Sequence, residues 1–256
     1  MANESLLNKK ILILGVANER SIAWAVAQKF AAEGAKIALS YPNEAILKRV
    51  EPLAKEISAE FVFPFDASNE DDYQKLKQHI QFEQIDGLVH SMAFANKDDL
   101  SNPFLQVSQK GFRQCLEISS YSLIGLCREL YPLFSNQASV MAMTYYGSQK
   151  IIPGYHLMGV AKAALECSIR YLALELGEQK QIRVNGLSAG PIRTLAASGV
   201  SGFKEKLKQA EEKSILKENV TQDEVAATAL YLASSLSQKV TGQILYVDSG
   251  LSSLGV

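Results

Sequence analysis

No apolar stretch of this 256-residue chain is long enough to cross a membrane, since runs such as residues 11–14 fall far short of the roughly 20 residues that a bilayer requires. Residues 1–10 also lack the apolar segment and cleavage site of a secretion signal. Charge of either sign is not in excess: 26 Lys and Arg oppose 27 Asp and Glu, for a net charge of −1. We therefore expect a cytoplasmic protein with neither a membrane nor a nucleic acid as partner.

Cysteine and histidine are both scarce. The three cysteines, separated by 12 and 40 residues, form no Cys-x-x-Cys pair and are read as buried core thiols. The three histidines stand apart from one another and from the acidic clusters that a metal site needs, so no metal is predicted. These residues are Cys115, Cys127, Cys167, His79, His90 and His156.

Short β-prone segments recur through the chain. They cover residues 10–15, 35–41, 60–66, 86–95, 139–146, 182–190 and 243–250. Their nearly continuous apolar character indicates burial on both faces, which is typical of a parallel sheet covered by helices. Helical patterns lie between them, one beginning near Ile22 and the others over 43–58, 69–82, 104–134, 156–178 and 221–236. The pattern predicts the α/β class: a single doubly wound, Rossmann-like domain over 1–256, with a seven-stranded, mostly parallel sheet and helices on both faces.

The turn after the first predicted strand contains candidates for phosphate binding. Gly15 ends that strand, and Ser21-Ile22 open the following helix. A glycine lets the backbone approach an anion, and a helix N-terminus presents unpaired N–H groups to it. The turn departs from G-x-G-x-x-G because Ala17 stands at the second glycine, so a plain strand-to-helix turn is the alternative.

Asp66, at the end of the third predicted strand, has two possible roles. Its carboxylate can accept a hydrogen bond from an adenine amino group, or it can form a turn or helix cap with Ser68-Asn69. The acid that commonly follows the second strand and binds ribose hydroxyls is missing, and Pro42-Asn43 stand there instead.

Tyr155 and Lys162 are candidate catalytic residues. If the helix begins at Tyr155, seven residues bring Lys162 to within about 20° of it and about 10.5 Å further along. A nearby ammonium group biases a phenol toward its anion, and such a phenol can serve acid catalysis on carbonyl compounds. The alternative is an interface tyrosine with a solvated lysine.

A candidate lid follows the sixth predicted strand. Residues 194–205 carry two glycines, which cost backbone entropy to order, together with Leu195, Val200 and Phe203, whose apolar surface needs cover. We expect this segment to order over an acyl site when cofactor and acyl ligand bind. A helix packed on the domain in every state is the alternative.

Taken together, these motifs resemble the short-chain dehydrogenase/reductase superfamily and, within it, the enoyl-acyl-carrier-protein reductases of the NADH-using type. The matching segments are GVANERSIAW, HSMAFAN, ISSYSL, MGVAKAALE, RVNGLSAGPIRTLAASG and VTGQILYVDSG. Ketone-reducing members of the superfamily have a Ser 13 residues before the Tyr and a Lys four after it, where this chain has Ala142 and Gly159. The spacing Tyr145-x9-Tyr155-x6-Lys162 resembles the enoyl reductases instead. A ketone or sugar reductase and a catalytically silent nucleotide-binding regulator are the rival interpretations.

The resemblance implies reduction of the trans-2 double bond of an enoyl thioester on acyl carrier protein by NADH, the final reductive step of fatty acid elongation, in a homotetramer. It implies that Tyr155 binds the thioester oxygen, that Lys162 holds the nicotinamide ribose, and that Tyr145 lines the acyl pocket. The implied substrate contacts are Ala95, Tyr145 and Tyr155. The implied cofactor contacts are Gly15, Ser21, Ile22, Asp66, Ala67, Met92, Lys162, Ile192, Arg193, Thr194, Leu195 and Ala196. NADPH is less favoured, because no Arg or Lys directly follows the second strand and Glu44 would repel a 2′-phosphate, although Lys48 and Arg49 lie about a turn later.

Overall fold

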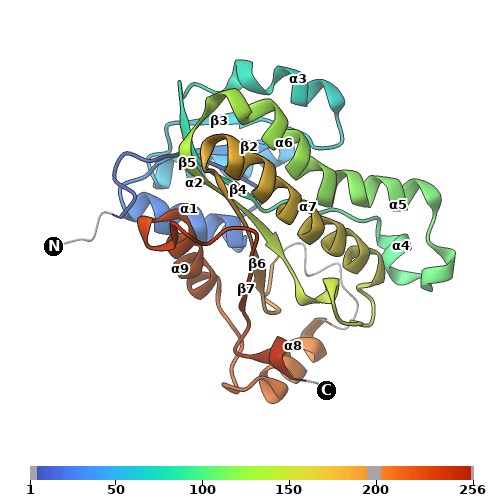
Figure 1. Ribbon diagram of the computed structural model, residues 1–256. Coiled ribbons are helices and arrows are strands. Elements are labelled where there is room, and N and C mark those ends of the chain that lie inside the picture. The colour runs from blue at the N-terminus through green and yellow to red at the C-terminus, as the bar shows by residue number, and fades with distance from the viewer. Residues whose placement is uncertain (1–4, 195–202, 255–256) are drawn as a thin grey trace.

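The computed structural model describes residues 5–194 and 203–254, which form one seven-stranded sheet flanked by helices (Figure 1). The strand order is β3-β2-β1-β4-β5-β6-β7, and every pairing between the described strands is parallel. The strands are β1 (Lys10–Leu14), β2 (Lys36–Tyr41), β3 (Phe61–Pro64), β4 (Ile85–His90), β5 (Phe134–Thr144), β6 (Arg183–Ala189) and β7 (Ile244–Val247). The predicted fold class is confirmed, and the sheet is wholly rather than mostly parallel.

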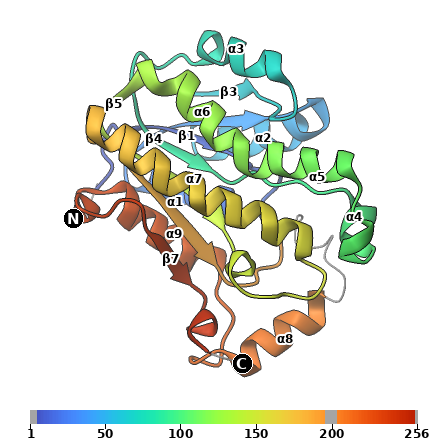
Figure 2. The same ribbon diagram turned by 45° about the vertical axis from the view of Figure 1, so that its right-hand side comes forward.

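Helices cover both faces of the sheet because alternate side chains of each strand point to opposite sides. Leu12 and Leu14 pack with one set of helices, whereas Ile11 and Ile13 pack with the other. The first set is α3 (Glu70–His79), α6 (Ser122–Leu130) and α7 (His156–Lys180), and Figure 2 shows α6 and α7 side by side over the strands. The second set is α1 (Ile22–Ala32), α2 (Glu44–Glu56) and α9 (Gln222–Ala233).

The segment 104–134, predicted as helical, is divided into shorter elements. After α4 (Lys97–Ser101) come η1 (Phe104–Gln106), α5 (Gln109–Leu116), a π-helical turn η2 (Glu117–Tyr121), α6 and η3 (Tyr131–Leu133). Strand β5 then begins at Phe134 rather than at residue 139. Apolar periodicity continues through α5, η2 and α6, so it does not mark the π-helical turn, and Pro132 limits the helix at its C-terminal end.

Sequence analysis also missed a helix near the C-terminal end. Helix α8 (Phe203–Lys213) is strongly charged, but Leu207 and Ala210 are buried, as the spacing of an amphipathic helix allows. The candidate lid over 194–205 falls mainly on residues 195–202, which lie outside the described ranges.

The order of the strands determines where a ligand can bind. Chain connections run in opposite directions from β1 and β4, which are neighbours, so a crevice opens at the carboxyl ends of these two strands. Gly15 begins the turn on the β1 side with φ +103°, and a Cβ there would lie 2.1 Å from the carbonyl oxygen of Ser91 on the β4 side. Only glycine therefore fits this turn without displacing backbone.

We predict that Gly15→Ala lowers the free energy of unfolding far more than Gly242→Ala. Both glycines have positive φ, which costs an alanine about 1–2 kcal/mol, but a Cβ at Gly242 meets only the Ala173 methyl at 3.7 Å. The clash with Ser91 should add about 1–3 kcal/mol at Gly15. Urea unfolding of both variants measures the difference, and equal losses would show that the close approach of the two strand ends does not constrain the fold.

Candidate active site

The residues predicted to contact a cofactor lie along the carboxyl ends of the strands. Gly15 follows β1, Met92 follows β4, and Ile192 follows β6, while Asp66-Ala67 come after β3. Their side chains or backbones are partly or fully buried at one edge of the sheet, which is the expected position of a nucleotide in this topology. Exposed Arg193 and half-buried Thr194 follow Ile192, whereas Leu195 and Ala196 lie outside the described ranges.

The β1-α1 turn is suited to an anion. Ser21 caps α1, and its Oγ accepts hydrogen bonds from the backbone N–H groups of Ala17 and Asn18 at 3.0 and 3.2 Å, which fix the shape of the turn. Ile22 begins the helix, whose first turn contains no acidic residue. No carboxylate of the first turn therefore competes with a bound anion for the positive end of the helix dipole.

Asp66 has a structural role in the turn after β3. Its Oδ1 accepts hydrogen bonds from the N–H and the Oγ–H of Ser68, at 2.9 and 2.8 Å. This geometry matches the turn-forming alternative. It does not decide between the two roles, because these hydrogen bonds leave the second carboxylate oxygen available.

Two buried polar atoms lack a hydrogen-bond partner in the described part of the chain, and both lie near the carboxyl ends of strands. They are His90 Nδ1, at the end of β4, and Ser188 Oγ, in the penultimate residue of β6. The Ser122 hydroxyl donates to the Ile118 carbonyl, so His90 Nε2–H donates to Ser122 Oγ at 2.7 Å and Nδ1 retains a bare lone pair. Orphaned polar atoms at this edge are consistent with a site that receives a polar ligand.

The loop after β4 is held by the π-helical turn η2. Ser119 Oγ accepts a hydrogen bond from the Phe94 N–H at 3.0 Å and lies 3.2 Å from the Phe94 carbonyl oxygen. The next residue, Ala95, packs with Tyr155 against a small apolar cluster that includes Leu157 and Met158. The structure thus brings two of the predicted substrate contacts together.

Tyr155 lies just outside α7, which begins at His156. It is the N-cap residue with φ −121° and ψ 4°, so the expected helical alignment from Tyr155 to Lys162 does not hold at its first residue. The Tyr155 ring instead packs against the turn η4 (Tyr146–Ser148): a Cβ at Gly147 would lie 2.6 Å from its Cδ1. The Tyr145 ring meets it edge-on, with centroids 4.9 Å apart, so the two predicted tyrosines are in contact.

Lys162 is buried, and its ammonium group donates a hydrogen bond to the Met143 carbonyl at 2.8 Å. Burial lowers the Lys162 pKa from 10.5 to about 8, against the opposing effects of Cys115 and Glu166. Burial also raises the Tyr155 pKa, with further increases from Cys115 and Glu166. The expected bias of Tyr155 toward its anion is therefore wrong: desolvation favours the neutral phenol, which can donate a hydrogen bond.

A cavity of about 720 Å³ opens beside the tyrosines. Tyr145, Tyr146 and the segment 150–153 form one wall, and residues of α8 form another. The cavity combines apolar side chains with a few charged ones, as does a site for an elongated, mostly apolar ligand. Its size and its contact with Tyr145 make it the candidate acyl site.

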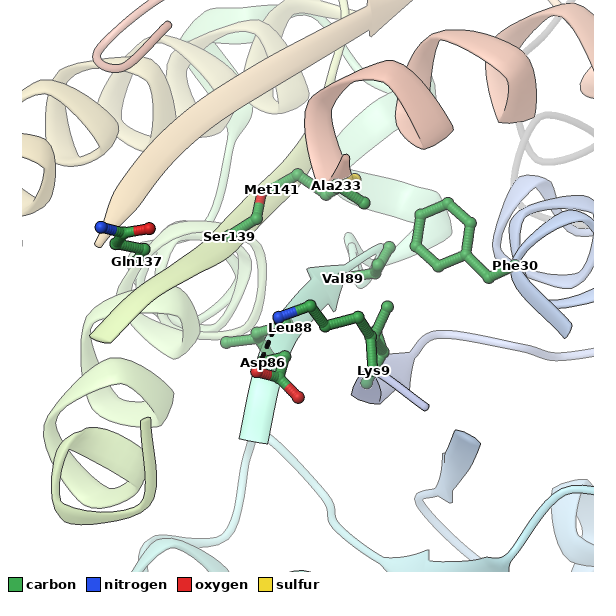
Figure 3. A pocket seen from close by; sticks show the side chains of 11 residues that line it. Lys9, Phe30, Asp86, Leu88, Val89, Gln137, Ser139, Met141 and Ala233 are labelled. Atoms are coloured by element: carbon green, nitrogen blue, oxygen red, sulfur yellow. Dashed lines mark hydrogen bonds and ion pairs between the residues drawn. The ribbon is translucent and has the colours of Figure 1, made fainter. Parts of the chain in front are cut away.

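A second cavity, of about 30 Å³, lies toward the amino ends of the strands (Figure 3). There Lys9 Nζ lies 3.3 Å from Asp86 Oδ1, which also accepts a hydrogen bond from Ser135 at 2.9 Å. This volume suits one or two water molecules. The charged pair joins the residue just before β1 to the second residue of β4, so we assign it a structural role.

Several residues of the site were missed by sequence analysis, among them Thr144, Ser148, Glu166 and Ser119. The spacing of four residues between Lys162 and Glu166 on one helix is a usable signal, because it places both on the same face. The prediction of three core thiols is wrong for Cys167, which is exposed on α7, and right for Cys115 and Cys127.

Across residues 5–194 and 203–254, no cluster of three or more His, Cys, Asp or Glu residues could hold a metal ion. Within the same ranges, no helix combines the length and apolar character required to cross a bilayer.

Comparison with known proteins gives matches over the whole chain. The family model described as enoyl-(acyl carrier protein) reductase matches residues 15–252. The NADH enoyl-acyl-carrier-protein reductase FabI of Rickettsia prowazekii is 45% identical over 257 residues, covering 100% of this chain and 98% of the relative. The crystal structure of the Aquifex aeolicus NADH enoyl-acyl-carrier-protein reductase superposes with a TM-score of 0.94 at 38% identity, covering 98% and 99% of the two chains. That of the Anaplasma phagocytophilum reductase in complex with NAD superposes with a TM-score of 0.93 at 40% identity, covering 98% and 96%.

We predict that Lys162→Met changes how stability depends on pH. Between pH 8 and 10.5 the unfolded chain retains a proton on Lys162 that the folded chain has released, so the wild type gains free energy of unfolding relative to the variant as pH rises. Below pH 8 the buried ammonium destabilises the fold. From pH 7 to 10 the difference should move by about 1–3 kcal/mol in favour of the wild type. Urea unfolding across this range measures it, with the exposed Lys239→Met as control; a pH-independent difference would contradict the assigned pKa.

Proposed function

This chain belongs to the enoyl-acyl-carrier-protein reductase family, and on that basis we propose how its own residues perform the reaction. The protein is an NADH-dependent oxidoreductase that reduces the trans-2 double bond of enoyl thioesters in the final reductive step of fatty acid elongation. The observation that supports the proposed site most directly is the contact of Tyr155 with Tyr145, which lines the 720 Å³ cavity, while buried Lys162 binds the carbonyl of Met143, two residues before Tyr145.

The residues present fit a dinucleotide at the carboxyl edge of the sheet. Gly15 leaves room where any Cβ would fill the turn, and the N-terminus of α1 faces the same crevice without an acidic residue in its first turn. Met92 follows β4, and Ile192 follows β6. The Lys162 ammonium donates one hydrogen bond to the Met143 carbonyl and has further protons that can bind a ligand. We propose that these residues hold the cofactor, with Lys162 binding the nicotinamide ribose hydroxyls.

Tyr155 is the proposed donor to the substrate. When bound, NADH would supply the hydride that adds to the β-carbon of the enoyl thioester; negative charge would then develop on the thioester oxygen until a proton adds to the α-carbon. The Tyr155 hydroxyl is neutral, and burial raises its pKa further, so it can donate a hydrogen bond to that oxygen and stabilise the enolate. The adjoining Tyr145 ring and the cavity beside it support an acyl-pocket role for Tyr145, and Ala95 packs in the same cluster as Tyr155.

A ketone reductase is disfavoured by the packing at Gly159. In that pattern a lysine occupies the fourth position after the tyrosine, but here a Cβ at that position would lie 2.6 Å from the Gly147 carbonyl oxygen. Any side chain at residue 159 would displace the turn that follows Tyr145.

A preference for NADH over NADPH follows from the β2-α2 junction. Tyr41 ends β2, Pro42 follows, and Asn43 caps α2 by accepting a hydrogen bond from the Ile46 N–H at 3.1 Å. Glu44 is exposed in the first helical turn, where a 2′-phosphate would approach, while Lys48 and Arg49 lie a turn further on. The carboxylate disfavours the additional phosphate by charge repulsion.

We also propose that the enzyme is a cytoplasmic homotetramer. Tyr171 and Leu174 on α7 are 71% and 60% exposed, and Tyr121 and Ile124 are exposed on the neighbouring η2 and α6. Exposed apolar side chains on adjacent helices are typical of subunit interfaces. Sedimentation of the purified protein measures its mass directly.

We predict that adding a crotonyl thioester removes the absorbance of NADH, with a higher kcat/KM for NADH than for NADPH. Glu44→Gln should raise kcat/KM for NADPH about 2- to 5-fold, because it removes one partly screened charge, and leave that for NADH nearly unchanged. The exposed Glu51→Gln on the same helix serves as the control. No reduction of the thioester would refute the proposed function, whereas a preference for NADPH would refute only the cofactor assignment.

We predict that Tyr155→Phe and Lys162→Ala act on different steps. Tyr155→Phe keeps the ring and removes the donor to the thioester oxygen, so kcat should fall about 10²- to 10³-fold with near-normal NADH affinity. Lys162→Ala removes the ribose contact and should raise the NADH dissociation constant. Steady-state kinetics and fluorescence titration measure the two effects, with exposed Tyr231→Phe as control; equal effects on NADH binding would contradict this division of roles.

A further inference from the structure

Glu166 is a buried carboxylate one helical turn beyond Lys162 on α7. Only 4% of the residue is exposed. Its Oε1 accepts hydrogen bonds from Thr144 Oγ1 and Ser148 Oγ, both at 2.7 Å. Burying a carboxylate is unfavourable unless such donors stabilise it, so this arrangement links Glu166 strongly to both hydroxyls.

The two hydroxyl donors flank Tyr145 and Tyr146 in sequence. Thr144 is the last residue of β5, and Ser148 is the last residue of η4, so Tyr145 and Tyr146 lie between them. One carboxylate oxygen therefore holds both ends of this short segment. The segment places the Tyr145 ring against Tyr155 and along the acyl cavity.

Two other contacts hold the segment 144–148 against α7, but neither is a hydrogen bond to Ser148. Lys162 binds the Met143 carbonyl, just before Thr144. Gly159 allows the helix to approach the Gly147 carbonyl closely. The turn is closed by its own backbone, through hydrogen bonds from the Ser148 N–H to the Tyr145 carbonyl at 3.0 Å and from the Gln149 N–H to the Tyr146 carbonyl at 2.9 Å. Among the contacts with α7, the one from Ser148 to Glu166 holds the far end of this turn.

We propose that Glu166 is a positioning residue for the reductase reaction, which fixes the turn between Thr144 and Ser148 and so holds Tyr145 against Tyr155 at the acyl site. This inference deepens the proposed function and rests on it. Glu166 itself contacts neither the acyl cavity lining nor the proposed cofactor residues by a hydrogen bond; it acts through the two hydroxyl groups.

The charge of Glu166 has a second, separable effect on Lys162. The groups that act on Lys162 through their charge or are affected by it are the Cys115 thiol from α5, the neutral His90 imidazole from β4 and Glu166 from α7 itself. Glu166 raises the Lys162 pKa and so opposes the effect of burial. Replacing it by glutamine should lower that pKa below about 8 while keeping an oxygen that can accept from the hydroxyls.

The test compares Thr144→Val, Ser148→Ala and Glu166→Gln with two matched controls on α7, Ser168→Ala and exposed Glu175→Gln. Losing one hydrogen bond should lower kcat with a crotonyl thioester about 3- to 10-fold in Thr144→Val and Ser148→Ala, with unchanged NADH affinity and pH profile. Glu166→Gln should instead shift the basic limb of the pH profile for NADH binding to lower pH. The controls should behave as the wild type.

A second readout does not depend on activity. In the wild type, the edge-on contact of Tyr145 with Tyr155 shifts their ring signals in a ¹³C-tyrosine NMR spectrum. These signals should move toward those of exposed tyrosines in Thr144→Val and Ser148→Ala but not in Ser168→Ala. If both variants keep wild-type kcat, KM and tyrosine signals and lose only thermal stability, Glu166 is merely structural and the proposal is overturned. An inactive wild type would refute the proposed function, and the tyrosine signals would still decide the role of Glu166.

Discussion

The close approach of α7 to the turn after β5 is the constraint on which the site depends. Gly159 and Gly147 meet where neither can carry a side chain, and the Tyr155 ring fills the space beside Gly147. Because Tyr155 lies at the N-cap and not within the helix, its position follows from this packing rather than from helical periodicity. The same approach brings Lys162 to the Met143 carbonyl and Glu166 to two hydroxyls of the turn.

Burial sets the protonation states that the chemistry needs. Burial of Tyr155 favours its neutral form, so the residue can act as a hydrogen-bond donor. The same burial brings the Lys162 pKa close to neutral pH, and Glu166 moderates that effect. His90 is kept neutral, with a pKa lowered to about 3 by burial and by Lys162, so it adds no positive charge beside Lys162.

Much of this arrangement is predictable from the sequence, for identifiable reasons. The seven apolar segments predicted the strands because both faces of a parallel sheet are buried, and the strand ends then located the turn at Gly15. The spacing from Tyr145 to Lys162 identified the tyrosines and the lysine through family resemblance. Their protonation states depend on burial in the folded chain, which no residue spacing reports. The link from Glu166 to Thr144 and Ser148 depends on a side chain one helical turn beyond the motif. Helix α8 was missed because its charged residues outnumber the buried Leu207 and Ala210.

In the proposed reaction, a neutral Tyr155 that is positioned by the α7 contact donates a hydrogen bond to the thioester oxygen. A crystal structure of the enzyme with NAD⁺ and an unreactive crotonyl thioester analogue tests this claim most directly. The expected result places Tyr155 Oη at about 2.6–3.2 Å from the thioester carbonyl oxygen, with the acyl chain along Tyr145. A complex in which that oxygen binds elsewhere, with Tyr155 beyond hydrogen-bond reach, would contradict it.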